Sequence, residues 1–201
     1  MRTTKLQFVE EKDESVRERK DNLRRFMKAR RADNANRDVK ELLMCDNVFA
    51  AINSDLTGAG TRLNFFVYLS YSSEAKTDKL IERLKKQGHF VYAPRIENKE
   101  MVPVLLEEDF TLSRYGIREP VGEVFDGRID VIVAPLLAVD KHGNRLGYGG
   151  GYYDAFFRKY PGAKRMAFCY DFQILQDVPN EACDEKIDVI VTDKQIVYVK
   201  N

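Results

Sequence analysis

The sequence predicts an α/β protein with three layers, α/β/α, and a mainly parallel sheet. From residue 65 onward, short apolar runs alternate with segments of helical periodicity, which is typical of parallel strands joined by crossover helices. The run Val131-Ile132-Val133-Ala134 has no polar face, as expected for a strand covered on both sides. With 201 residues the chain is long enough for one such domain and too short for two large ones.

A pair of helices is expected before the first strand. Ser15-Val16-Arg17-Glu18 fits a capping box, so the first helix should begin there and run to about Arg31. A second helix, capped by Asn34 or Asn36, should run to about Asn53. The apolar residues at helical spacing, which should face inward, are Val16, Leu23, Phe26, Met27, Val39, Leu42, Leu43, Val48, Phe49 and Ile52.

Strands and helices then alternate along the rest of the chain. A strand at 65–69, a helix at 77–87 closed by Gly88, and a strand at 90–93 stopped by Pro94 form a βαβ unit. The later elements are strands at 101–106, 129–134, 165–169 and 187–192, a helix at 151–160, and a C-terminal edge strand at 195–199.

The composition is that of an ordinary water-soluble globule. The counts of 33 Lys and Arg against 32 Asp and Glu give a net charge that attracts no particular partner. Residues 1–14 are polar and aperiodic, so we expect a flexible tail followed by a single domain at 15–201. We find no leader or membrane-spanning run, which favours the cytoplasm. Cys45, Cys169 and Cys183 have no disulfide or zinc spacing.

The segment from Gly143 to Asp154 holds five of the twelve glycines and lies between a strand and a helix. Such a turn lets backbone N–H groups approach a ligand, and the helix N-terminus adds positive potential, so phosphate is favoured. Arg145 could fork onto phosphate oxygens, and Asp154 would suit a divalent cation between it and the phosphate. The alternative is a tight turn that only packs a strand against a helix.

Other polar residues extend this candidate site. Lys20, Arg24, Lys28 and Arg31 form one stripe on the first helix, which would suit an anion or would simply be a solvated face. A nucleic-acid role for this stripe lacks interleaved aromatic residues. Glu74 follows a strand and could bind an amino-heterocycle or cap a helix.

Two further residue types bear on the chemistry. Asp184 could join Asp154 on a cation or be an ordinary turn residue. Neither histidine has a visible nucleophile or acid partner, which argues against histidine acid–base catalysis.

Together these segments resemble the 5-formyltetrahydrofolate cyclo-ligases, also called methenyltetrahydrofolate synthetases. Residues 20–24 fit K-x-x-L-R, Glu74 with Thr77 fits E-x-x-T, and 115–120 fit an aromatic-G-I-x-E-P element. Residues 130–135 lead into the specific R-L-G-x-G-x-G-Y-Y-D core that ends at Asp154. The resemblance covers about 20–193. It implies ATP- and Mg²⁺-dependent conversion of 5-formyltetrahydrofolate to 5,10-methenyltetrahydrofolate, with phosphorylation of the formyl oxygen followed by attack of N10.

The resemblance also implies roles for individual residues, with Arg145 and Lys20 as the catalytic pair. The implied ATP-binding residues are Lys20, Arg24, Arg145, Leu146, Gly147, Tyr148, Gly149, Gly150, Gly151, Tyr152 and Tyr153. The implied folate-binding residues are Leu69, Glu74, Tyr115, Gly149, Gly150, Gly151 and Tyr152, and the implied metal ligands are Asp154 and Asp184. The chain departs from the family at Leu136 (usually Gly), Val139 (usually Phe) and Cys183 (often His).

The expected partners are 5-formyltetrahydrofolate and ATP, without a membrane or nucleic acid, and a monomer is expected. One alternative is a folate- or nucleotide-binding module without turnover, which could attach to RNA through its basic helix. The Arg145/Asp154 pair argues against it, because a module that only holds ligands does not need to place a metal on a transferring phosphoryl group. Another alternative is the same fold acting on a different formylated or carboxylated substrate.

Overall fold

The computed structural model describes residues 15–55, 61–113 and 116–200, so the expected tail at 1–14 lies outside it. Within these residues the main sheet has seven strands in the order β12-β11-β9-β6-β1-β2-β3. The inner neighbours pair in parallel, whereas β12 and β3 run antiparallel at the two edges. These strands are β1 (Asn64–Val67), β2 (Phe90–Glu97), β3 (Glu100–Leu105), β6 (Val131–Ala134), β9 (Lys164–Phe168), β11 (Val189–Val191) and β12 (Ile196–Tyr198).

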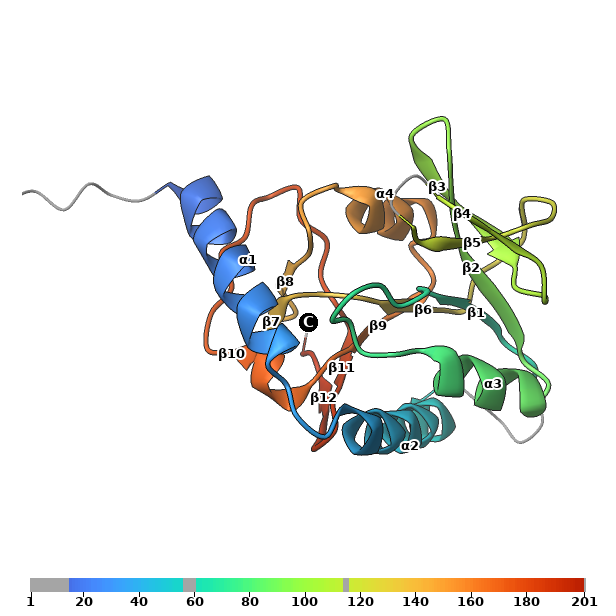
Figure 1. The fold of residues 1–201 in the computed structure, drawn as a ribbon, viewed down its shortest axis with the longest axis horizontal. Helices are drawn as coiled ribbons and strands as arrows, with labels where there is room; N and C mark the ends of the chain where they lie inside the picture. The colour runs from blue at the N-terminus through green and yellow to red at the C-terminus, as the bar shows by residue number, and fades with distance from the viewer. Residues whose placement is uncertain (1–14, 56–60, 114–115, 201) are drawn as a thin grey trace, which may run out of the picture.

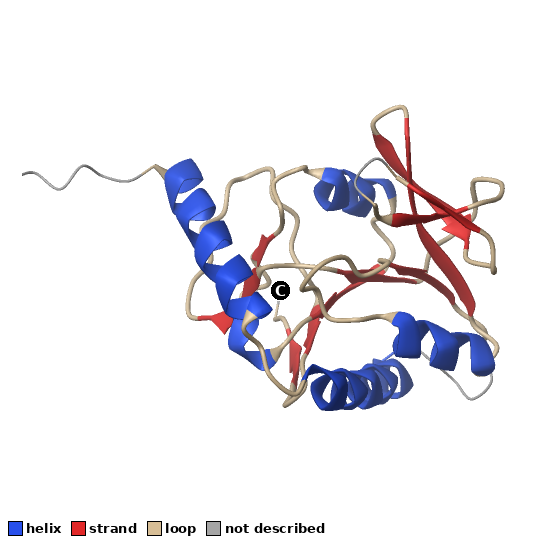
Figure 2. Cartoon of the chain, in the orientation of Figure 1, coloured by secondary structure: helices blue, strands red, loops and turns tan. Residues whose placement is uncertain are grey.

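Helices cover both faces of this sheet, which confirms the predicted α/β class (Figures 1 and 2). The helices α2 (Arg37–Asp55) and α3 (Asp78–Lys86) cover one face, and α4 (Tyr152–Lys159) covers the other. Alternate strand residues serve the two faces, because side chains along a strand point to opposite sides. Phe65 packs in the cluster with α2 and α3, while Phe66 stacks on Phe156 of α4 with ring centroids 4.0 Å apart.

The N-terminal helix α1 (Val16–Ala32) stands beside these layers (Figure 1). Its predicted capping box is present, with Ser15 and Glu18 bonded reciprocally. Met27 packs α1 onto a small three-stranded sheet, whose strands were not predicted. These strands are β7 (Ala138–Asp140), β8 (Arg145–Leu146) and β10 (Ile174–Leu175).

The strand expected to stop at Pro94 instead continues to Glu97 and forms a hairpin with β3. Pro94 lies beyond Tyr92, the last residue of β2 that pairs with β1, and its partner Pro103 lies on the edge strand. A sheet tolerates the missing N–H of proline at such positions. A second hairpin, β4 (Phe110–Leu112) with β5 (Arg118–Pro120), was also not predicted.

Several residues expected to face inward are instead exposed. Phe26 of α1 is 60% exposed, and α1 buries Lys20, Met27 and Arg31. On α2, Met44, Cys45, Val48 and Ile52 are buried. The expected inward residues that the structure exposes are Val16, Phe26, Val39, Leu42 and Leu43. Within the described residues, none of the helices combines the length and apolar character needed to cross a bilayer.

Candidate active site

The glycine turn joins β8 to the start of α4. Arg31 bonds both Tyr148 of this turn and the carbonyl of Leu136, which lies just beyond the carboxyl end of β6. Gly149 and Gly151 have φ of +97° and +69°, which glycine adopts without strain. A Cβ at Gly147 would lie 2.8 Å from Nη1 of Arg145, and one at Gly149 would lie 3.3 Å from Cζ of Arg24. The glycines therefore allow two guanidinium groups to approach the turn, which a turn built only for packing would not need.

Arg145 and Asp154, which bracket the turn, form an ion pair. Nη2 of Arg145 donates to Oδ1 of Asp154 at 2.9 Å, and the arginine side chain is only 5% exposed. Its guanidinium carbon lies 5.7 Å from the ring centre of Tyr153 and 5.5 Å from that of Phe157. Among the described residues its Nε finds no hydrogen-bond partner. An unmet buried donor is costly, but this nitrogen is shielded and Arg145 does not line the pocket between α1 and the turn, so a ligand would reach it only if neighbouring side chains moved.

Two cations of α1 face the turn and its surroundings. Lys20 is buried, and its Nζ donates to Oε2 of Glu181 at 2.7 Å and to Oδ2 of Asp184 at 2.6 Å. Burial opposes the charge of Lys20, but the hydrogen bonds to the two carboxylates outweigh it and raise the lysine pKa. Nε of Arg24 donates to the carbonyl of Gly147 at 3.0 Å. Half of the stripe is therefore not a solvated face, since Lys20 and Arg31 are buried.

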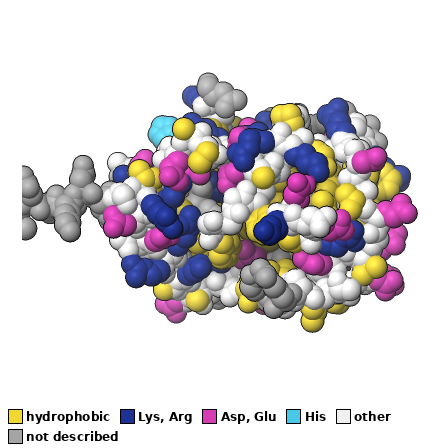
Figure 3. Space-filling view, turned by 90° about the horizontal axis from the view of Figure 1, so that it is seen from above, with side chains coloured by type: hydrophobic (Ala, Val, Ile, Leu, Met, Phe, Trp, Pro, Cys, Tyr) yellow, Lys and Arg dark blue, Asp and Glu magenta, His cyan; other side chains and the backbone are white. Residues whose placement is uncertain are grey.

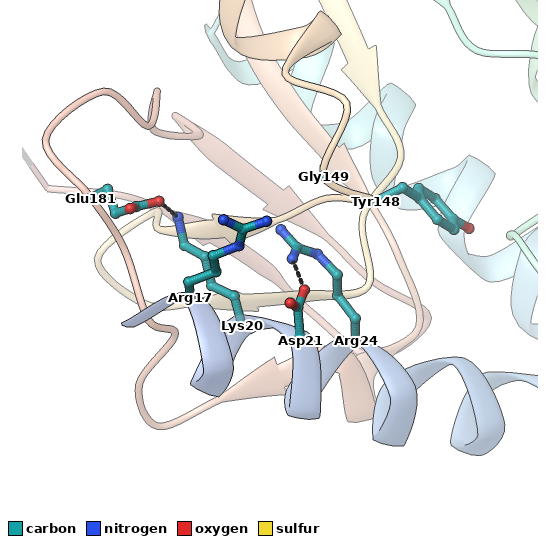
Figure 4. A pocket seen from close by; sticks show the side chains of 7 residues that line it. All are labelled: Arg17, Lys20, Asp21, Arg24, Tyr148, Gly149 and Glu181. Atoms are coloured by element: carbon teal, nitrogen blue, oxygen red, sulfur yellow. Dashed lines mark hydrogen bonds and ion pairs between the residues drawn. The ribbon is translucent and has the colours of Figure 1, made fainter. Parts of the chain in front are cut away.

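A pocket of about 390 Å³ lies between α1 and the glycine turn (Figure 4). In Figure 4 three cationic side chains project from α1 toward the loop that carries Tyr148 and Gly149. Figure 3 shows Lys and Arg side chains gathered at the end of the molecule where α1 lies, with acidic side chains among them. Such a pocket suits a polyanion. Its lining residues are Arg17, Lys20, Asp21, Arg24, Tyr148, Gly149 and Glu181.

Glu74 lies on the other side of Tyr148, in the loop that follows β1. Its carboxylate is buried, accepts a hydrogen bond from the N–H of Tyr71 at 2.8 Å, and lies near the Tyr148 hydroxyl. Burial raises the pKa of Glu74. Glu74 does not cap α3, whose N-cap is Thr77. Leu69 is buried at the start of the same loop, whereas Tyr115 lies outside the described residues.

The carboxylates expected to hold a metal lie on adjacent segments. Oδ1 of Asp154 accepts the N–H of Glu185 at 3.2 Å, next to Asp184. Both hydrogen bonds to Asp154 within the described chain fall on Oδ1, which leaves Oδ2 for a cation. Carboxylate oxygens are hard ligands that suit Mg²⁺. Cys183 lies near Asp184 and Glu181, but its thiol is a soft ligand.

The structure also locates the two remaining residues that differ from the family and three residues whose part in the site was not predicted. Leu136 and Val139 are buried in the hydrophobic cluster under α4. The pocket residues Arg17 and Glu181 were not predicted, because neither lies in a recognisable motif. The contact of buried Arg31 with Tyr148 was not predicted either.

A glycine turn at the carboxyl end of parallel strands, faced by cations, defines an α/β protein that binds phosphorylated ligands. Sequence comparison gives the particular family. The chain belongs to the 5-formyltetrahydrofolate cyclo-ligase family, whose model matches residues 16–193. It is 31% identical over 141 residues to the 5-formyltetrahydrofolate cyclo-ligase of Escherichia coli K12, covering 65% of this chain and 78% of that protein. The mouse enzyme of the same name is 30% identical over 143 residues, 62% and 70% of the two chains.

Solved structures agree on the fold. The NMR structure of Aquifex aeolicus 5,10-methenyltetrahydrofolate synthetase matches with a TM-score of 0.75 and 24% identity. That match covers 90% of this chain and 93% of the Aquifex chain, so it includes both the helical pair and the main sheet.

Proposed function

We propose that this chain closes the ring of 5-formyltetrahydrofolate to give 5,10-methenyltetrahydrofolate, with ATP converted to ADP and phosphate. Membership of the cyclo-ligase family supports the reaction. The observation that carries the proposal to this site is the glycine turn itself, where Gly149 has positive φ beside the guanidinium of Arg24 and Gly147 lies against that of Arg145.

The phosphates of ATP would bind between α1 and the glycine turn. Lys20 and Arg24, which line the pocket, would supply charge together with Arg145, which does not line it but lies against Gly147 of the turn. The backbone of residues 147–153 would supply N–H donors. Lys20 would then exchange part of its present carboxylate contacts for phosphate contacts. Because a phosphoryl group spreads charge over its oxygens during transfer, fixed cations of this kind stabilise the transition state.

Asp154 and Asp184 would hold Mg²⁺, and the free Oδ2 of Asp154 supports this assignment. When bound, the ion would neutralise phosphate charge. Asp154 has a second task in this arrangement, because its Oδ1 also fixes the orientation of Arg145.

The folate would occupy the side of the site that contains Leu69, Glu74 and the turn from Gly149 to Tyr152, with Tyr115 stacking on the pterin. A buried carboxylate such as Glu74 can accept hydrogen bonds from the amino and ring N–H groups of a pterin. The formyl oxygen would then attack the terminal phosphorus, and N10 would attack the activated carbon and displace phosphate. This chemistry depends on positioning and charge more than on an acid–base pair.

The test is to mix protein, 5-formyltetrahydrofolate and Mg-ATP and follow the absorbance of the methenyl product. We expect product to form only when all components are present. A protein that binds both ligands and never forms product would instead be a binding module. We further propose that the enzyme acts as a monomer in the cytoplasm, which sedimentation and cell fractionation would test.

A further inference from the structure

Arg31 is buried at the end of α1 where three other segments meet. Its Nε donates to Oγ of Ser73 at 3.1 Å, its Nη1 donates to the carbonyl of Leu136 at 2.9 Å, and its Nη2 donates to the hydroxyl of Tyr148. The residue is 2% exposed. Because a buried charge is costly unless its donors are satisfied, these bonds fix the guanidinium in one orientation.

Tyr148 contacts both sides of the site. The residue lines the cationic pocket with Arg24 and Gly149, and in Figure 4 its side chain extends away from Lys20 toward the far side of the turn. Its hydroxyl accepts the bond from Arg31 and lies near enough to the carboxylate of Glu74 to lower the pKa of that group against the effect of burial. One side chain thus connects the phosphate pocket to the folate loop.

These contacts favour the ionised form of Glu74. Burial disfavours that form and raises the pKa of Glu74, while the hydrogen bond from the Tyr71 N–H and the nearby Tyr148 hydroxyl act in the opposite direction. Arg31 contributes its positive charge at longer range and also holds Ser73, the residue before Glu74.

We propose that Arg31 and Tyr148 are positioning residues that hold Glu74 for the folate and lock its loop to the glycine turn. The inference rests on the proposed function, because it gives these residues a task in folate binding. Neither belongs to the motifs that define the family resemblance: Tyr148 fills the variable position after Gly147, and Arg31 lies beyond the K-x-x-L-R segment. A residue that only braced the fold would change stability without changing affinity for one substrate.

The first variant is Tyr148→Phe, which keeps the ring and removes only the hydroxyl. Loss of a hydrogen bond to a charged group predicts a rise on the order of tenfold in KM for 5-formyltetrahydrofolate. The KM for ATP should change by less than about twofold, because the ring and the backbone N–H groups stay in place. Since Tyr148 is 42% exposed, this variant should fold.

The second variant is Arg31→Lys, which keeps the charge but cannot make all three bonds. It should also raise the KM for folate, and adding Tyr148→Phe to it should raise that KM little further, because both act through one chain of contacts. The matched control is Arg30→Lys, the same change at the neighbouring residue, whose guanidinium lies 5.0 Å from the ring of Phe172. The control should keep both KM values.

Calorimetric titration with 5-formyltetrahydrofolate alone separates this inference from the proposed reaction. Wild-type protein that binds folate without turnover would refute the reaction, while a tenfold weaker binding of folate by Tyr148→Phe would still support the positioning role. The inference is overturned if Tyr148→Phe binds folate like the wild type, if the KM for ATP rises as much as that for folate, or if the effects of the two variants multiply.

Discussion

Replacing Arg145 by alanine should strongly lower the kcat/KM of the enzyme. A preorganised donor that stabilises charge in a transition state contributes about 2–4 kcal/mol, which corresponds to a fall of about 30- to 900-fold in kcat/KM. The side chain is only 5% exposed, so water cannot take over its role. Arg145→Ala should still bind 5-formyltetrahydrofolate in the absence of ATP, because the contacts of Arg145 within the described residues are with Asp154, Tyr153, Phe157 and Gly147 and not with Leu69 or Glu74.

The same substitution should also lower stability, which a sequence-only view would not anticipate. Loss of one partner of a buried ion pair costs about 3–5 kcal/mol. Asp154 is 20% exposed and keeps the N–H of Glu185, so we expect about 1–3 kcal/mol here, near the cost of an ordinary lost bond to a charged group. Urea unfolding measures this loss independently of activity.

The assay is the rate of methenyl formation at several ATP concentrations, measured well below the unfolding transition of each variant. Arg145→Lys is the matched variant, because it keeps a positive charge and loses the Nε donor and the forked geometry. We expect it to lie between wild type and alanine. Arg145→Ala with wild-type kcat/KM would refute the assignment of this arginine to the transferring phosphate, and full activity of Arg145→Lys would show that the free Nε has no role.

Three further predictions follow from the same contacts. Asp154→Asn should lower turnover strongly at limiting Mg²⁺, and wild-type turnover under those conditions would contradict the metal assignment. It should also lower the unfolding free energy by about 1–3 kcal/mol, because the amide oxygen can still accept from Arg145 but leaves the buried guanidinium without its counter-charge. Lys20→Ala should raise the KM for ATP several-fold more than the KM for folate, and equal changes in both would remove its phosphate-specific role. Glu74→Gln should weaken folate binding yet match or exceed the wild type in stability near neutral pH, because burial raises the Glu74 pKa and so penalises its charged form.

Because the pKa of Glu74 is raised in the folded protein, its contribution to the free energy of unfolding depends on pH. A carboxyl group whose native pKa lies above its usual 4.5 binds more protons in the folded than in the unfolded state. The stability of wild type relative to Glu74→Gln should therefore fall as the pH rises from below 4.5 through the raised native pKa. Denaturant titrations across that range test this, and a difference that is constant with pH would exclude a raised Glu74 pKa.

The parts of the fold that were predicted correctly depend on local signals. The capping box at Ser15 and the apolar run at 131–134 are properties of a few neighbouring residues, and both have the structure that their sequence predicts. Helical spacing identified residues of α1 and α2 that share a face, but it did not indicate which face the rest of the chain covers. Phe26 is therefore exposed while Arg31 is buried, because the groups that receive its hydrogen bonds come from Ser73, Leu136 and Tyr148.

The same distinction applies to the candidate site. Arg145 and Asp154 are nine residues apart on one turn, so their pairing could be anticipated from the segment itself. Lys20 and Asp184 are 164 residues apart, and only the packing of α1 against the far end of the chain brings them together. The bond between Tyr148 and Arg31 was beyond prediction for the same reason.

The attachment of α1 has a consequence for the dynamics of the enzyme. This helix meets the rest of the protein through the small cluster around Met27 and through polar bonds, while the main cores lie elsewhere. Elements with few apolar contacts open at a lower free energy than the global unfolding, and ligands that need them closed suppress that opening. Lys20, Arg24 and Arg31 all lie on α1, so the site is complete only while α1 is packed against the rest of the protein. Substrate concentration in the cell would thus regulate how long the N-terminal part of the chain stays protected from proteases.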